Sequence, residues 1–354
     1  MLSAFSWCAG FSAKRTVPMY GCLAGLAIAC VLLQSACTTA NTRLQRIRAR
    51  GFLVCGVHPE IVGFATVDTN GHYAGFDVDM CRAVATAIFG APDRSRFVPA
   101  PSVQHFLDSD EIDIVSRRLT WTLEREGSRL LFGPVSFFDG QGFLLPRARG
   151  ISTVQQLSGA KVCIVPGLIT EFNLATYFRT NHLALNKVAL PSSNLLDEAF
   201  STGQCDAYTG DLSELGSARV GLKDREAYEI LDTQISKEPL AQLVRNDDVG
   251  LFMILRWSVF ALIAAEELGV TSQNLPEMET SDRLDVQRLL GLIPGNGRSL
   301  GLDERWAYNI IRALGNYGEI YERNLGMSSP VRLPRGLNAQ WTAGGLMYAP
   351  LFRQ

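Results

Sequence analysis

The stretch GFLVCGVHPEIVGFATVDTNGHYAGFDVDMCRAVATAIFG, residues 51–90, contains the unit from which the fold of this chain is predicted. It opens with a short apolar run, 51–57, that has the length of a buried strand. Asn70-Gly71 is a strong signal for a hairpin turn. Asp77 is then a candidate N-cap for a helix whose apolar residues, from Cys81 to Ile88, recur at helical spacing before a glycine ends it.

The alternation of strands and helices continues along the chain. Residues 96–101 are predicted to form a strand, and 106–115 a helix end followed by a strand. The pattern restarts near residue 151, and from about residue 245 onward the chain is mainly helical. A βαβ order implies mostly parallel sheets, and the restart implies two α/β lobes. A cleft at the carboxyl ends of the strands is the usual ligand site in such an arrangement.

The first 36 residues have the features of a secretory signal. They contain no acid and only two basic residues, Lys14 and Arg15, which precede the apolar run VPMYGCLAGLAIACVLLQSAC. The small residues before Cys37 favour a cleaved signal over a transmembrane anchor, whose length of ~20 residues the run approaches. QSAC also resembles a lipoprotein signal box, which would place a lipid on Cys37. Cleavage after Ala36 or Ala40 without a lipid is the alternative.

A second apolar segment, 249–269, is interpreted as a buried helix of a large core. Arg256 in its middle and Glu266 and Glu267 at its end would make a membrane span costly.

Four of the eight cysteines lie outside the export region, namely Cys55, Cys81, Cys163 and Cys205. An exported chain enters an oxidising compartment, which favours disulfides. There is no C-x-x-C and the four histidines are scattered, so the spacing does not fit a zinc site. We favour the pairs Cys55–Cys81 and Cys163–Cys205, because each would tie an apolar strand to the next element of its own half. Each would contribute on the order of 3 kcal/mol. Four free buried thiols are the alternative.

The composition favours a binding protein over an enzyme. The 354 residues carry a net charge of only −2, which gives no indication of a nucleic-acid surface. No H-E-x-x-H, G-x-S-x-G or Walker motif occurs. We therefore expect no catalytic residues, no cofactor and no metal.

Three features together suggest a site for an α-amino acid. Thr120 and Arg125 follow the predicted strand 112–115, and a guanidinium can bind a carboxylate through two hydrogen bonds. The segment CIVPGLITEF, 163–172, places a helix start after a strand and a glycine, where backbone N–H groups attract an anion. Asp211 follows another strand and can accept from an ammonium group. The alternatives are a surface role for Arg125 and a helix cap for Asp211.

Six segments together resemble bacterial extracellular solute-binding proteins of family 3, and in particular the periplasmic subunit of the general L-amino-acid ABC transporter. They are GFDVDMCRAVATAIFG, DEIDIVSRRLTWTLERE, FFDGQGFLL, TEFNLATYF, QCDAYTGDLSEL and SKEPLAQLVRNDD. The tail, with LGNYGEIYERNLG and RGLNAQW, is similar to that subfamily too. The resemblance runs in order from about residue 44 to 352.

The resemblance implies a two-lobed α/β periplasmic-binding-protein (Venus-flytrap) fold of type II. Lobe 1 would comprise 44–143 plus 245–354 and lobe 2 would comprise 144–244, joined by two crossing strands. Such a protein is a periplasmic monomer that closes on a free amino acid and delivers it to ABC permease subunits in the membrane. No nucleic acid is expected as a partner.

The resemblance also implies roles for individual residues. Arg125 would clamp the ligand carboxylate, Thr120 would add its hydroxyl, and Asp211 would hold the ammonium. His58 and Ile61 stand at positions that often contact the ligand side chain.

Three residues depart from the family pattern. Leu168 and Ile169 follow Gly167 where hydroxyl residues are usual, so a side-chain hydrogen bond worth ~1–3 kcal/mol is lost. Arg118 stands where the subfamily tends to have a small polar residue. One hypothesis is that Arg118 selects an acidic side chain or a second carboxylate, and another is that it fills the pocket. The alternatives for the whole chain are a degenerate or repurposed solute-binding sensor with an altered ligand, and an enzyme on the same scaffold.

Overall fold

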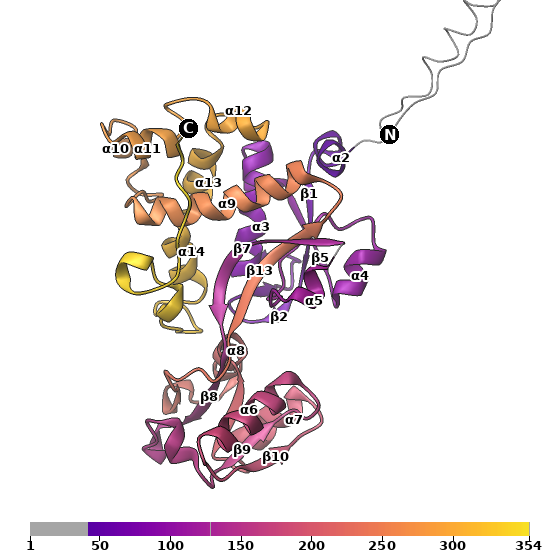
Figure 1. Cartoon of the computed structure of the whole chain (residues 1–354), viewed down its shortest axis with the longest axis vertical. Coiled ribbons are helices and arrows are strands. Elements are labelled where there is room, and N and C mark those ends of the chain that lie inside the picture. Colours follow the sequence, from indigo (N-terminus) through magenta and orange to yellow (C-terminus); the bar gives the residue numbers. More distant parts are fainter. Residues whose placement is uncertain (1–41, 128, 354) are drawn as a thin grey trace, which may run out of the picture. The chain divides into compact units, whose positions relative to one another are not determined.

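Strand β1 (Leu53–Val57) lies inside the first of two five-stranded sheets (Figure 1). The computed structural model describes residues 42–127 and 129–353, which belong to one compact unit. The predicted signal, 1–36, and Cys37 lie outside the described residues. The order of the first sheet is β5 (Ser95–Pro99), β1, β6 (Ile114–Val115), β13 (Glu238–Arg245) and β7 (Leu130–Asp139). In this sheet β1 pairs in parallel with its two neighbours, and β13 pairs antiparallel with both β6 and β7.

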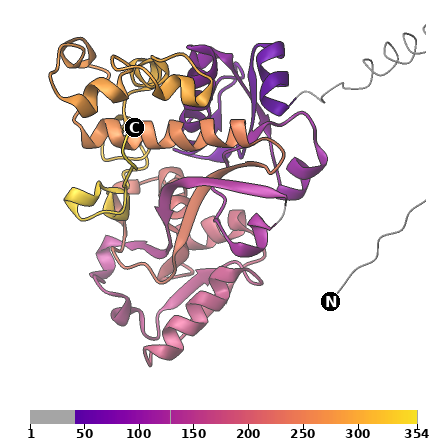
Figure 2. The same ribbon diagram turned by 45° about the horizontal axis from the view of Figure 1, so that its top comes forward.

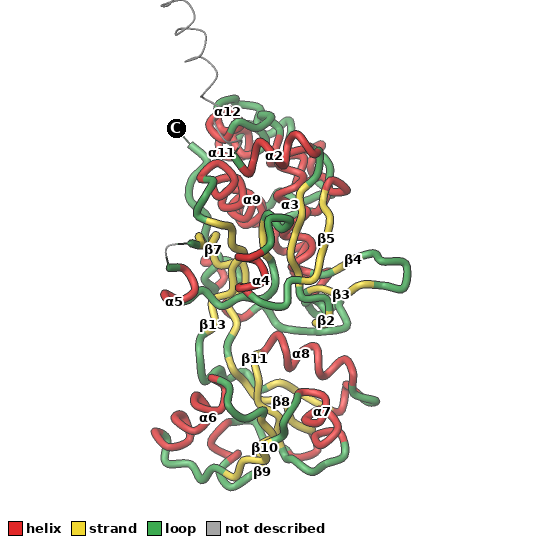
Figure 3. Tube along the Cα trace, turned by 90° about the vertical axis from the view of Figure 1, so that its right-hand side faces the viewer, coloured by secondary structure: helices red, strands yellow, loops and turns green. Residues whose placement is uncertain are grey.

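The second sheet has the same plan of parallel strands completed by antiparallel ones. Its order is β10 (Asn186–Ala189), β9 (Lys161–Ile164), β11 (Ala207–Asp211), β8 (Gln141–Pro146) and β12 (Tyr228–Ile230). Helices α6 (Ile169–Thr180), α7 (Ser193–Ser201) and α8 (Leu212–Gly221) lie around it (Figure 3). Each sheet with its own helices forms one lobe, so the predicted two-lobed α/β architecture is present.

The chain passes between the lobes twice, and the two passages touch. It leaves the first sheet at Asp139 and enters the second at Gln141, whose N–H donates to Ser236 Oγ at 3.1 Å. Gly140 between them has no space for a side chain, because a Cβ there would lie 2.6 Å from the carbonyl oxygen of Ser236. The limits of the lobes at 143/144 and 244/245 stay a prediction.

The predicted hairpin and helix of residues 58–90 are both present, but the cap of the helix differs. A small sheet contains β2 (Glu60–Ile61), β3 (Ala65–Val67) and β4 (Tyr73–Ala74). Helix α3 (Phe76–Phe89) begins after Gly75, whose φ of 135° and close approach to the Phe64 carbonyl exclude a side chain. The prediction that Asp77 is the N-cap was therefore wrong. Its carboxylate is only 5% exposed and accepts a hydrogen bond from Ser116 Oγ at 2.8 Å.

Helix α9 (Val249–Glu267) crosses the first lobe beside β7 and β13 (Figure 2). Among the described helices it is the one that is long and apolar enough to cross a membrane, and 61% of its most apolar window is buried. Its side chains, including Ile254, Leu255 and Leu262, belong to the main hydrophobic core. This agrees with its interpretation as a core helix.

The other helices of the first lobe are mostly short. They are α2 (Arg43–Arg50), α4 (Val103–Asp108), α5 (Leu123–Glu126), α10 (Leu275–Met278), α11 (Leu284–Leu289), α12 (Asn296–Leu300), α13 (Trp306–Leu314) and α14 (Tyr317–Asn324). The mainly helical structure predicted from about residue 245 onward is present. A turn at Gly315 and an Asn316–Glu319 capping box separate α13 from α14.

One disulfide lies in each lobe. Cys55 of β1 is bonded to Cys81 of α3, with a Cα–Cα distance of 6.3 Å. Cys163 of β9 is bonded to Cys205, with a Cα–Cα distance of 5.6 Å. These are the two pairs that the sequence favours. The first ties β1 to helix α3, and the second ties β9 to the loop between α7 and β11.

Candidate functional site

The segment from Arg117 to Arg125 leaves the carboxyl end of β6 and is held against β13. The Trp121 N–H donates to the Pro239 carbonyl at 2.8 Å, and Thr120 forms an isolated bridge with Leu240. Thr122 caps the short helix α5 by accepting from the Arg125 N–H at 3.2 Å.

The Arg125 side chain folds back over this segment. Its Nη1 donates to the Thr120 carbonyl at 2.8 Å, so Thr120 and Arg125 lie together. Within the described part of the chain the Arg125 guanidinium forms no ion pair with a carboxylate. Several of its N–H groups are therefore available to an anion.

Asp211 ends β11 in the second lobe and stands at the N-cap position of α8. Asp211 thus occupies the position that the helix-cap alternative gives it, but its side chain makes no capping hydrogen bond. Burial, reinforced by the charges of Asp139 and Glu238, raises the pKa of Asp211 to about 7, against the lowering effect of Arg118. A partly buried carboxylate that caps no helix N–H is suited to accept from an ammonium group.

The start of helix α6 is less open to a ligand than the sequence suggests. The Gly167 N–H donates to the Glu171 carboxylate at 2.9 Å, so this donor is already used within the chain. Ile169, the first residue of α6, is 63% exposed, and Leu168 is 55% exposed. Two apolar side chains therefore face solvent at this loop.

Arg118 connects the two lobes. It has a φ of 55°, in the left-handed region, and its Nη1 donates to the Ser213 hydroxyl of α8. The guanidinium carbon also lies 5.7 Å from the ring centre of Phe64. Its charge lowers the pKa of the buried carboxyls Asp77 and Asp139, which burial itself raises.

A cavity of about 700 Å³ lies next to Arg118, and residues of both lobes line it. The first lobe contributes His58, Glu60, Ile61 and Arg118. The second lobe contributes Ser193, Asn194, Asp197, Tyr208, Glu214, Ser217, Ala218 and Gly221. Two nitrogens of these lining residues, His58 Nδ1 and Arg118 Nε, are buried and form no hydrogen bond with another described residue. Burial, and then the charge of Arg117, lowers the pKa of His58, which favours the neutral imidazole.

Comparison with known proteins identifies the family of this chain. Residues 53–326 match the family of bacterial extracellular solute-binding proteins, family 3. The chain belongs to this family. The resemblance noted in the sequence is thereby confirmed.

The similar family 3 proteins cover nearly the same length as this chain. The general L-amino acid-binding periplasmic protein AapJ of Rhizobium johnstonii is 44% identical over 330 residues, which are 92% of this chain and 97% of AapJ. The glutamate/glutamine/aspartate/asparagine-binding protein BztA of Rhodobacter capsulatus is 43% identical, with the same coverage. A solved ABC transporter/periplasmic binding protein from Brucella ovis with glutathione bound is 43% identical. It covers 88% of this chain and 100% of its own, with a TM-score of 0.79.

The structure brings some of the predicted family 3 site residues together and leaves others apart. Arg118, His58 and Ile61 line one cavity. The charges of Arg118 and Glu214, which line the cavity, act on the pKa of Asp211, but Asp211 itself does not line the cavity. Thr120 and Arg125 form a separate cluster on the first lobe, and Ile169 lies on α6.

Sequence reasoning missed the second-lobe side of the cavity. Glu214 and Ser217 lie on α8, which the sequence analysis did not predict, and Asp197 lies on α7. The spacing of Asp211 and Glu214, three residues apart, could have indicated two carboxylates on one face of a helix.

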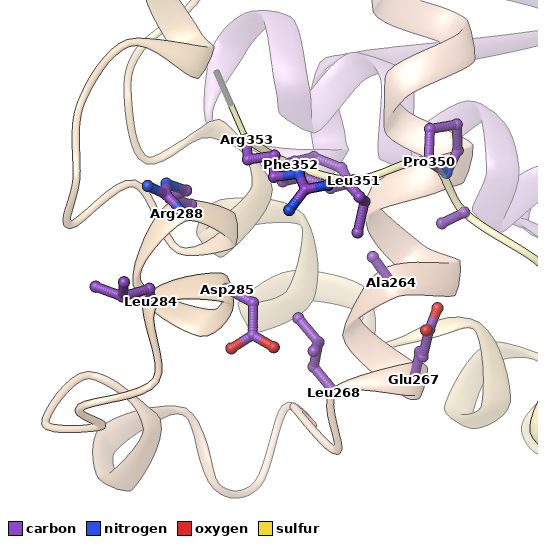
Figure 4. Close-up of a pocket in the computed structure, with 11 residues that line it drawn as sticks. Ala264, Glu267, Leu268, Leu284, Asp285, Arg288, Pro350, Leu351, Phe352 and Arg353 are labelled. Carbon is purple, nitrogen blue, oxygen red and sulfur yellow. The ribbon is translucent and has the colours of Figure 1, made fainter.

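A second cavity, of about 370 Å³, lies away from all the predicted site residues (Figure 4). The end of α9, helix α11 and the C-terminal segment line it with Leu268, Leu284, Leu351 and Phe352 among others. Within the described residues, no group of three or more His, Cys, Asp or Glu is placed to hold a metal ion.

Proposed function

We propose that this protein is the periplasmic substrate-binding component of an amino-acid ABC transporter. It captures a free L-amino acid by closure of its lobes and delivers it to the membrane permease. The observation that carries the proposal is a division of charge. Among the described residues, Arg125 of the first lobe has a guanidinium without an acidic partner, and Asp211 of the second lobe has a carboxylate that makes no capping hydrogen bond. An α-amino acid carries the two complementary charges on adjacent groups.

The residue roles follow from this division. Arg125 binds the α-carboxylate through two hydrogen bonds, Thr120 adds its hydroxyl, and Asp211 accepts from the α-ammonium. His58, Ile61 and Arg118 contact the ligand side chain, and the backbone at Ile169 contacts the carboxylate from the second lobe. Closure is favoured because the bound ligand interacts with both lobes at once.

The proposal also covers the limits of the lobes, the oligomeric state and the location of the protein. The lobes comprise 44–143 plus 245–354 and 144–244. The protein acts as a monomer, catalyses no reaction and binds no nucleic acid. It is held in the periplasm either freely or by a lipid on Cys37. The full names of AapJ and BztA, which describe binding proteins, support this reading.

The test is titration calorimetry on residues 38–354, which include every element described above. The panel contains the proteinogenic amino acids, small dicarboxylates and glutathione, the last because the Brucella ovis relative holds it. Saturable heat with at least one α-amino acid is expected. A folded protein that binds none of the amino acids would contradict the proposal.

A second candidate is a repurposed sensor of the same fold. The hydrogen bond between Arg118 and Ser213 favours it, because a side chain of the protein already links the lobes beside the cavity. Binding of a panel member that lacks the α-amino acid group, with no response to any amino acid, would support this candidate.

A further inference from the structure

A segment near the C-terminus connects the two lobes a third time. The match to the family 3 model ends at residue 326, and residues 327–338, here named the strap, follow directly. The strap therefore lies beyond the part of the chain that the family model matches. The two passages of the chain between the lobes are covalent, whereas the strap joins the lobes through hydrogen bonds and packing.

The strap is firmly attached to the first lobe. Tyr321 of α14 is fully buried, and its hydroxyl donates to the Pro334 carbonyl at 2.9 Å. The side chain of Asn338 forms two hydrogen bonds with the backbone of Phe138 on β7, at 2.7 and 3.1 Å. Phe138 directly precedes Asp139, where β7 ends, so the strap is held beside the passage into the second lobe.

One arginine of the second lobe holds the strap. Arg219 of α8 donates from Nη2 to the carbonyl oxygens of Val331 and Arg332, at 2.6 and 2.9 Å. Arg332 has a φ of 51°, a conformation that residues with a side chain rarely adopt. In this conformation two consecutive carbonyl oxygens reach the same nitrogen. Hydrogen bonds from a charged donor are stronger than those between neutral groups, so Arg219 is the main polar contact.

Apolar packing supports the same contact between the strap and α8. Val331 and Leu333 are buried, and a Cβ on Gly216 of α8 would lie 2.7 Å from a methyl carbon of Val331. Glycine at this position therefore lets the strap approach the helix closely. Next to it, Ser217 accepts from the Val62 N–H of the first lobe at 3.0 Å. The middle of α8 is thus fixed to the first lobe.

The same helix lines the cavity of about 700 Å³ with Glu214, Ser217 and Ala218, whereas Arg219 does not line it. A movement that separates the lobes at this cavity moves α8 away from the first lobe, so it must break the hydrogen bonds of Arg219. Residues 333–338 line a further cavity, of about 210 Å³, together with residues of the second lobe. The strap therefore does not pack tightly along its whole length, and the contact with Arg219 carries much of its hold on the second lobe.

We propose that the strap is a latch that limits how far the two lobes open, and that Arg219 is the positioning residue that fastens it. A latch of this kind keeps the lobes near the arrangement that holds a ligand and so lowers the conformational cost of closure. The effect on ligand affinity rests on the proposed function. The limit on opening does not, because its contacts lie within the chain.

The experiment compares residues 38–354 with the variant Arg219→Met, which keeps an unbranched side chain but removes the donors. Small-angle X-ray scattering without added amino acid should give the variant a larger radius of gyration. Amide hydrogen exchange of the peptide that contains Leu333 should become roughly tenfold faster. Arg149→Ala is the matched control, because it breaks an ion pair with Asp206 inside the second lobe. It should match the unchanged protein in both measurements.

A saturating amino acid should return the radius of gyration of Arg219→Met to that of the unchanged protein, with a dissociation constant roughly threefold to tenfold higher. A larger radius that the bound amino acid does not reverse would indicate a damaged second lobe and would overturn the latch. Equal radii and equal exchange in the variant and the unchanged protein would also overturn it. If no amino acid binds, the proposed function fails, while scattering and exchange still decide whether the latch exists.

Discussion

The two lobes share a plan but present opposite charges to the ligand site. Each has a five-stranded sheet of parallel strands completed by antiparallel ones, one disulfide and a covering layer of helices. The first lobe presents arginines after β6, among them Arg118 and Arg125. The second lobe presents carboxylates after β11 and on its helices, namely Asp197, Asp211 and Glu214.

This difference explains how one fold can recognise a zwitterion. Arg125 of the first lobe is a cation and Asp211 of the second lobe is an anion, so each of these residues satisfies only one end of the ligand. Both ends are satisfied only when the two lobes hold the same molecule, and the free energy of binding then favours the closed state. The comparison also identifies Arg118 as the exception, since this first-lobe cation already contacts the second lobe through Ser213.

Among the changes considered, removal of the Arg125 cation of the first lobe should weaken ligand binding most. Arg125→Ala should weaken amino-acid binding by about 4 kcal/mol, roughly a thousandfold, because the ligand carboxylate is left without its charged partner. Titration calorimetry measures the loss. The matched control is Arg129→Ala, since Arg129 is exposed nearby and lines no part of the cavity. Equal losses in both variants would contradict the role of Arg125.

The role of Asp211 in the second lobe can be tested by measuring ligand affinity as a function of pH, because the pKa of Asp211 is raised to about 7. An ammonium group binds the ionised carboxylate, so protonation competes with the ligand, and affinity falls as pH decreases through 7. The dissociation constant should rise roughly a hundredfold between pH 8 and pH 5. The neighbours that set this pKa are Asp139, Glu238 and Glu214, which raise it, and Arg118, which lowers it.

Asp211→Asn provides the control for this pH dependence. The variant cannot ionise at this position, so its binding should be weak at pH 8 and nearly independent of pH. Binding by the unchanged protein that stays constant from pH 8 to pH 5 would show that Asp211 does not hold the ammonium.

The periodic elements of the fold could be predicted from the sequence because their signals are local. Apolar runs of strand length, the Asn70-Gly71 turn and the cysteine spacing each depend on a few neighbouring residues, and the structure agrees with them. The cap of α3 was mispredicted because the choice between Gly75 and Asp77 depends on a distant contact. Only the approach of the Phe64 carbonyl, set by the hairpin, requires glycine there.

The candidate site could be predicted only in part. Arg125 and Asp211 follow strands, so position in the chain was enough to suggest them. Helix α8 was missed, since it begins directly after a strand without a side-chain cap and contains two glycines, Gly216 and Gly221. With α8 missed, the second-lobe wall of the cavity could not be deduced, and neither could the partner of Arg118.

The smallest expected effect concerns the charge of Arg118, which acts from the first lobe on Asp211 of the second. Its positive charge lowers the pKa of Asp211, so Arg118→Asn should raise that pKa. The pH at which half of the affinity is lost would then increase by up to about one unit. At pH 7 this shift corresponds to less than a tenfold loss of affinity. Titrations across pH 5 to 9 measure the midpoint. Arg118→Lys keeps the charge but not the planar guanidinium, so it should keep the midpoint while weakening the link to Ser213. A midpoint that does not move in Arg118→Asn would mean that Arg118 only joins the lobes mechanically and leaves the ammonium site unchanged.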